Sequence, residues 1–282
     1  MSSLPERRKA ILFLVLAAVL WSTGGLMIKA SDWQPLSIMA GRCLFSVVVL
    51  LLYLRRFPTH WTRWKLAAAA AHVLTSFLFI TSTKLTTAAN AIFLQYTAPV
   101  YVVLLGIWLL HERPTRTDWI SMGVIFAGMI FFFGDALTLD GLHGNLLAVL
   151  SGLSLAMMTV ALRAQKDGVP AESILLGQLF MAVAGFPSIL KESWTVANWL
   201  IVLYLGVFQI GVAFIFFTAA IKHVPAIEAT LVGTLEPVLN PVWVFLFIGE
   251  RPGRFALLGG LIVLAGVGLS ALGGARAGLE PA

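Results

Sequence analysis

Long apolar segments fill most of this chain, and short polar or charged stretches separate them. We take charge clusters, prolines and polar breaks as the boundaries between segments. Each segment holds about 20 residues, which is enough for an α-helix to cross about 30 Å of hydrocarbon. The pattern therefore predicts ten transmembrane helices, at about 10–29, 35–54, 64–82, 88–110, 117–134, 144–163, 171–190, 197–220, 226–248 and 255–273.

Two of these segments resemble each other in sequence. Residues 88–116 and residues 226–254 each contain a proline in mid-segment and a Glu-Arg-Pro motif near the end. A shift of 138 residues superposes them, and it matches Pro99 with Pro237, Glu112-Arg113-Pro114 with Glu250-Arg251-Pro252, and Arg116 with Arg254. The chain therefore consists of two similar halves.

Each half contains five of the predicted helices. Because five is an odd number, the second half enters the membrane in the opposite sense to the first. Inverted repeats are typical of transporters, since exchanging the conformations of two similar halves moves a central site from one membrane face to the other. We therefore expect an all-α integral membrane protein with one repeat over residues 1–138, a second over residues 139–282, and a central cavity between them.

The composition supports this class and excludes several others. Hydrophobic residues make up 59% of the chain and charged residues only 11%, which excludes an ordinary soluble globular protein. Cys43 is the only cysteine, so no internal disulfide framework forms. The net charge of +6 arises from residues between the predicted helices rather than from one basic face, so we expect no nucleic-acid partner.

Most Lys and Arg residues outside the predicted helices fall on the side of the membrane that holds the N-terminus. The positive-inside rule then places both termini in the cytoplasm, and a bacterial inner membrane is the natural setting. Arg7-Arg8-Lys9 followed by an apolar run resembles a secretory signal. Because that run continues to about Ile28, we interpret it as a retained first helix.

The paired motif resembles a known family. A proline in mid-helix followed 13 residues later by Glu-Arg-Pro, in two copies, resembles the EamA-type repeat of the drug/metabolite transporter superfamily. The resemblance implies ten helices around a central substrate pathway, with no cofactor. The chain length and the Trp-rich and Phe-rich helices are similar to those of bacterial exporters of aromatic and other neutral amino acids, and export as the direction of transport rests on this resemblance alone.

The prolines interrupt the hydrogen bonding of their helices. Each proline lacks a backbone N–H, so Pro99 frees the carbonyl of Gln95 and Pro237 frees that of Gly233. Within a membrane, such carbonyls are tolerated only where protein or water satisfies them. We expect these segments to line the pathway or to act as bending points, and a purely structural kink is the alternative.

Glu236 lies about ten residues into its predicted helix, roughly 15 Å from the boundary. A lone carboxyl group at this depth is either protonated or faces a polar cavity. Asn240 follows one turn later on the same face, whereas the first half has Ala98 at the position of Glu236. We expect Glu236 to bind a substrate ammonium group or to serve in proton coupling, and a neutral structural acid is the alternative.

Arg42 is a second charged residue inside a predicted helix, about seven residues from its start. One possibility is that its guanidinium group attracts a carboxylate, either of the substrate or of Glu236. We favour instead a structural role or snorkelling of the long side chain to the surface.

Aromatic, sulfur-containing and polar side chains within apolar helices indicate a mostly apolar cavity with a few polar groups, suited to amphipathic small molecules. Contacts with lipid or between helices are the alternative for each residue taken alone. The candidate substrate-binding or pathway residues are Trp21, His72, Ser76, Phe79, Gln95, Tyr96, Pro99, Tyr101, Met158, Gln209, Glu236, Pro237, Asn240 and Trp243.

No motif indicates catalysis, a metal site or ATP hydrolysis. The five histidines are scattered without metal-ligand spacing, and there is no phosphate-binding loop. We therefore predict a secondary transporter, not an enzyme, that exports neutral and aromatic amino acids by alternating access. The alternatives are a multidrug or cationic-metabolite exporter and, from a different class, an intramembrane enzyme or receptor. The expected partners are amino acids, as small-molecule substrates, and the lipid bilayer, and the sequence does not specify an oligomeric state.

Overall fold

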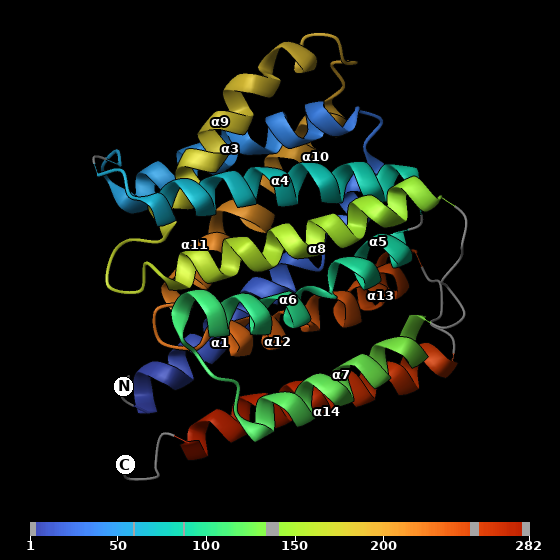
Figure 1. The fold of residues 1–282 in the computed structure, drawn as a ribbon. Helices are drawn as coiled ribbons and strands as arrows, with labels where there is room; N and C mark the ends of the chain where they lie inside the picture. The colour runs from blue at the N-terminus through green and yellow to red at the C-terminus, as the bar shows by residue number, and fades with distance from the viewer. Residues whose placement is uncertain (1–3, 59, 87, 134–140, 249–253, 278–282) are drawn as a thin grey trace.

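A computed structural model of the chain describes residues 4–58, 60–86, 88–133, 141–248 and 254–277. Every regular element in these ranges is a helix (Figure 1). In chain order the helices are α1 (Leu4–Trp21), α2 (Gly24–Ala30), α3 (Pro35–Leu54), α4 (Arg63–Leu85), α5 (Ala88–Gln95), α6 (Ala98–Leu105), η1 (Gly106–Leu110), α7 (Arg116–Phe133), α8 (Leu142–Arg163), α9 (Ala171–Ile189), α10 (Val196–Tyr204), η2 (Leu205–Val212), α11 (Ala213–Ala220), α12 (Ala226–Gly233), α13 (Leu235–Ile248) and α14 (Arg254–Ala277). The elements η1 and η2 are π-helices.

Seven helices in the described part of the chain are long and apolar enough to cross a membrane. They overlap seven of the ten predicted segments, namely those that begin at about 10, 35, 64, 88, 144, 171 and 197. The other three predicted segments are also helical over most of their length, as α7, as α12 with α13, and as α14. The fold is therefore that of an integral membrane protein, and the count of ten crossings stays a prediction.

The long helices lie side by side in a bundle, with the start of α1 and the end of α14 at the same end (Figure 1). We call this the termini end. The closest partners are α4 with α8, α3 with α9, and α7 with α14. At the edge of the bundle in Figure 1, α7 and α14 run beside each other.

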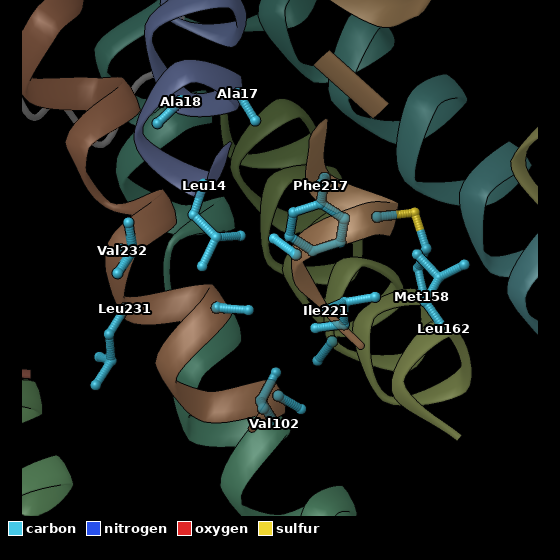
Figure 2. Packing of buried hydrophobic residues seen from close by; sticks show 14 of the residues in the cluster. Leu14, Ala17, Ala18, Val102, Met158, Leu162, Phe217, Ile221, Leu231 and Val232 are labelled. Atoms are coloured by element: carbon cyan, nitrogen blue, oxygen red, sulfur yellow. The ribbon is translucent and has the colours of Figure 1, made fainter. Parts of the chain in front are cut away.

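Buried apolar side chains from both halves of the sequence form the core. Figure 2 shows part of this cluster, in which side chains of α1, α6, α8, α11 and α12 pack against one another. Because lipid tails are as apolar as these side chains, helices in a membrane associate through close packing rather than through the hydrophobic effect. The labelled members are Leu14, Ala17, Ala18, Val102, Met158, Leu162, Phe217, Ile221, Leu231 and Val232.

Small residues allow the closest helix contacts. A Cβ atom added at Gly128 of α7 would lie 2.8 Å from the backbone N of Val263 and 2.9 Å from the backbone O of Gly259, both in α14. The two backbones therefore approach as closely as a glycine permits, in the manner of small-residue packing in membranes.

We predict that Gly128→Ala destabilises the protein by about 1–3 kcal/mol, because the added methyl group meets backbone atoms that cannot move independently of the helix. Gly123→Ala is the matched control, since Gly123 lies in the same helix and has nothing within 4 Å of its added Cβ. The control should raise stability by about 0.5–1 kcal/mol, as alanine is the better helix former. Thermal unfolding in detergent measures both changes, and equal stability of the two variants would refute the close packing of α7 on α14.

Candidate functional site

Several helices are interrupted at positions that converge in the middle of the bundle. The α-helical hydrogen-bond pattern is interrupted between α1 and α2 at residues 22–23, between α5 and α6 at residues 96–97, and between α12 and α13 at Thr234. The π-helix η2 lies between α10 and α11. Interrupted helices and π-helices inside membranes are common features of binding sites.

Hydroxyl side chains at these interruptions satisfy nearby backbone carbonyls. Each accepting carbonyl lies three residues earlier in the chain, and the partner is a Ser or Thr at the break. Without such partners a buried carbonyl is costly, since the membrane core offers no water. The bonds are Ser22 Oγ to Val19 O (2.6 Å), Thr23 Oγ1 to Leu20 O (2.7 Å), Thr97 Oγ1 to Leu94 O (2.7 Å) and Thr234 Oγ1 to Leu231 O (2.6 Å).

Tyr96 connects the two proline-containing segments. Its hydroxyl oxygen lies 2.8 Å from the backbone O of Gly233 and 2.6 Å from Glu236 Oε2. The Gly233 carbonyl is the one that Pro237 deprives of its helical partner. The side chain from one interruption therefore satisfies a carbonyl at the other, which is consistent with the predicted effect of the proline.

The hydrogen count at Tyr96 constrains the state of Glu236. A phenol has one hydrogen to donate. If that hydrogen is donated to the Gly233 carbonyl, the short contact with Glu236 Oε2 is a hydrogen bond only when the Glu236 carboxyl group donates its own proton to the phenol oxygen. An ionised Glu236 instead takes the phenol hydrogen, and the Gly233 carbonyl loses it. Protonation of Glu236 is thus linked to the hydrogen bonding of the helix break.

A cavity of about 90 Å³ lies where the interruptions converge. Helices from both halves of the chain contribute to it, and its walls are largely apolar and aromatic. Nine of the fourteen candidate residues line the cavity: Trp21, His72, Ser76, Phe79, Gln95, Tyr96, Met158, Gln209 and Glu236. The structure therefore brings most of the candidates together, while their role in binding stays a prediction.

The other candidates lie outside the lining. Pro99 is buried in α6, and Tyr101 is half-buried against the core. Pro237 follows Glu236 in α13 and is buried. Trp243 donates a hydrogen bond from Nε1 to Ser22 Oγ at 2.7 Å, so it braces the break between α1 and α2. Asn240 belongs to α13, and its side chain lies outside the described residues.

Five lining residues were not among the candidates. Leu155, Ile210 and Phe214 are apolar residues in apolar helices, so the sequence pattern carries no signal for them. Thr75 adjoins the candidate Ser76, and this adjacency is a usable signal. The fifth is Arg42, whose side chain is buried, with only 3% of the residue exposed. Snorkelling to the surface, one of the two roles favoured for Arg42, is therefore wrong, because the residue is buried and lines the cavity, whereas its structural role stays a prediction.

Ion pairs connect the helices at the termini end. Glu112 Oε1 accepts a bond of 2.7 Å from Arg163 Nε, and its Oε2 accepts one of 3.1 Å from the backbone N of Ala226. Arg7 pairs with Glu228. The motif at Glu112 lies between η1 and α7, which agrees with the predicted helix end. The matching motif at Glu250 lies outside the described residues.

Lys65 and Glu172 form a further buried pair at the same end, with 2.5 Å between Nζ and Oε2. Within the part of the chain that the structure describes, no group of three or more His, Cys, Asp or Glu side chains is placed to hold a metal ion. The charged groups at the termini end therefore hold helices together.

Two relatives with similar sequences are named as transporters. An uncharacterized transporter of Archaeoglobus fulgidus is 26% identical over 254 residues, covering 90% of this chain and 93% of that protein. The uncharacterized transporter YxxF of Bacillus subtilis is 22% identical, covering 94% of this chain and 90% of that protein. A solved crystal structure superposes with a TM-score of 0.81 over 94% of this chain and 98% of the other, at 20% identity, which shows the fold alone.

The family assignment rests on a sequence profile that matches this chain twice. The profile of the EamA-like transporter family, part of the drug/metabolite transporter superfamily, covers residues 8–134 and residues 142–272. These two ranges take up most of the chain, and the names of the relatives indicate membrane transport rather than enzymatic catalysis. This multi-pass membrane protein therefore belongs to the EamA-like transporter family.

Proposed function

We propose that this transporter exports neutral and aromatic amino acids from the cytoplasm by alternating access around the central cavity. The observation that carries the proposal is the cavity itself, which combines apolar and aromatic walls with the carboxyl group of Glu236 at a helix interruption. An apolar amino acid offers the matching chemistry, since it has an ammonium group beside an apolar side chain.

The proposal includes ten transmembrane helices in two inverted repeats. The two matches of the family profile support this arrangement. Helix contacts support it as well. The contact of α4 with α8 has a counterpart, with the two halves exchanged, in the contact of α11 with α1. The last helices of the two halves, α7 and α14, pack on each other. The helix ends at Gln95 and Gly233, which precede the two proline-containing breaks, are separated by the same 138 residues as the sequence match.

We further propose that both termini face the cytoplasm of a bacterium. Basic residues at the ends of helices support this orientation. The start of α1 and the ends of α3 and α8 lie at the termini end of the bundle (Figure 1), and Arg7 lies near the start of α1, Arg55 directly follows α3 and Arg163 ends α8. Positively charged residues favour the cytoplasmic side of a membrane. The ion pairs of the termini end then lie on the cytoplasmic side of the cavity.

The cavity must widen to admit such a substrate. Its volume of about 90 Å³ is smaller than the roughly 150 Å³ of an engineered protein cavity that holds one benzene molecule. The interrupted helices are suited to this change, because halves joined by a break can tilt independently. We interpret the structure as a closed state of the transport cycle.

Glu236 also favours a second candidate function, the export of organic cations. A carboxyl group among apolar walls is the natural partner of an amphipathic cation as well as of an amino acid. The two proposals differ in the need for a carboxylate on the substrate, which is the basis of the tests below.

The contacts of Tyr96 support proton coupling. The phenol serves both the Gly233 carbonyl and the Glu236 carboxyl group, so a change in the protonation of Glu236 alters the bonding at the helix break. Arg42 and His72 line the same cavity. The proton gradient is the proposed energy source.

The first test is transport by the purified protein alone. Liposomes that contain only this protein should take up or release labelled phenylalanine and leucine faster than liposomes without it. Unlabelled neutral amino acids should compete, and organic cations should not. Absence of flux for every neutral amino acid would overturn the proposal, and competition by organic cations alone would establish the second candidate function.

The second test concerns the proton. Transport by the native protein should change between acidic and neutral pH, and Glu236→Gln should remove that dependence, because glutamine cannot release a proton. His72→Gln is the control for the other titratable group at the cavity. It should retain the pH dependence. If Glu236→Gln transports as fast as the native protein at every pH, Glu236 has a structural role only.

A further inference from the structure

Arg42 is a buried cation at the cavity, and none of the described residues forms an ion pair with it. It lies in the middle of α3 and is 3% exposed. The ion pairs in the described ranges involve Arg7, Arg56, Lys65 and Arg163 instead. Buried within the protein, Arg42 Nε also has no hydrogen-bond partner among the described residues.

The groups around Arg42 do not neutralise it. His72 also lines the cavity; its Nε2 lies 2.8 Å from Nε2 of Gln178, while its Nδ1 has no hydrogen-bond partner among the described residues. An imidazole ring carries no negative charge that could neutralise Arg42. Gln209 contributes an uncharged amide. Glu236, the other charged residue of the lining, has its Oε2 on the hydroxyl of Tyr96. The cavity therefore holds one cation and one carboxyl group that are not paired with each other.

Close packing fixes the position of Arg42. A Cβ atom added at Gly206 of η2 would lie within 2.3 Å of the backbone O of Arg42 and 2.7 Å of Phe45 Cβ. The backbones of α3 and η2 thus touch at Arg42, in the turn that precedes Gln209. A guanidinium group on such a rigid support is suited to binding a ligand, since little freedom is lost on binding.

An unpaired charge inside a membrane protein is costly, and a ligand of opposite charge relieves the cost. Guanidinium groups bind carboxylates through two parallel hydrogen bonds, a geometry that an ammonium group cannot reproduce. An organic cation would leave Arg42 without a partner, and a simple anion would leave the carboxyl group of Glu236 without one. A zwitterion satisfies both.

We propose that Arg42 binds the carboxylate of the transported substrate while Glu236 receives its ammonium group, so that the substrate class is the zwitterionic α-amino acid. This inference rests on the proposed transport function and specifies its substrate. The two charges come from opposite halves of the chain. At a shift of 136 residues Gly41-Arg42 matches Gly177-Gln178, so Gln178 stands at the position of Arg42, and Ala98 stands at the position that matches Glu236. The asymmetry gives the substrate one orientation in the cavity.

The test compares three probes that differ in one charged group each: L-phenylalanine, L-phenylalaninamide, which lacks the carboxylate, and 3-phenylpropionate, which lacks the ammonium group. Calorimetry on the purified full-length protein measures their affinities. The native protein should bind L-phenylalanine at least about tenfold more tightly than either analogue, the range expected for a charge-assisted hydrogen bond.

Arg42→Gln should remove the preference for L-phenylalanine over its amide and keep the preference over 3-phenylpropionate. Glu236→Gln should show the reverse pattern. Arg56→Gln is the matched control, since it removes a cation that pairs with Glu172 outside the cavity, and it should keep both preferences. If Arg42→Gln does not fold, Arg42→Lys replaces it. This variant should bind L-phenylalanine about tenfold more weakly than the native protein and keep some preference for it over the amide.

Several outcomes would overturn the inference. Unchanged preferences in Arg42→Gln, or equal weakening of all three probes, would show that Arg42 is only structural. The same calorimetry can be run with chloride. If Arg42→Gln loses chloride binding and binds L-phenylalanine as the native protein does, Arg42 is a site for an inorganic anion instead. A native protein that binds 3-phenylpropionate through Arg42 but no amino acid would refute the proposed function and leave the carboxylate site standing.

Discussion

The need to satisfy every backbone polar group within the membrane is the constraint on which this structure depends. The helices are interrupted around the central cavity, and each broken turn needs partners that the membrane does not provide. Hydroxyl groups at Ser22, Thr97 and Thr234 bond carbonyls three residues earlier, and Tyr96 bonds the Gly233 carbonyl from another helix. Of these side chains, Tyr96 also lines the cavity, so one residue both satisfies the helix break and contributes to the candidate site.

The two halves of the chain contribute different chemistry to this shared framework. The first half supplies the guanidinium of Arg42 and the phenol of Tyr96, while the second supplies the carboxyl group of Glu236. In the proposed transport cycle, similar halves would exchange conformations, as alternating access requires. The different side chains of the two halves would then hold the proposed zwitterionic substrate in one orientation.

The apolar segments were predictable from sequence because hydrocarbon thickness dictates their length, and the break near Glu236 was predictable because Pro237 cannot donate a hydrogen bond. Polar residues such as His72 and Gln209 were found because they are rare and costly in apolar helices. The π-helix containing Gln209 and the burial of Arg42 were missed. Both depend on how α3 packs against η2. This contact joins residues far apart in the sequence, so the local sequence pattern carries no signal for it.

The most direct measurement of the central claim is protection of the cavity by substrate. Ser76 lines the cavity and Cys43 is the only cysteine of the chain, so Ser76→Cys in a Cys43→Ala background places one thiol at the proposed site. A small membrane-impermeant thiol reagent should label this cysteine, and L-phenylalanine should slow the labelling by about tenfold near saturation. A labelling rate that L-phenylalanine leaves unchanged, or a thiol that stays unreactive from both sides of the membrane, would contradict the account.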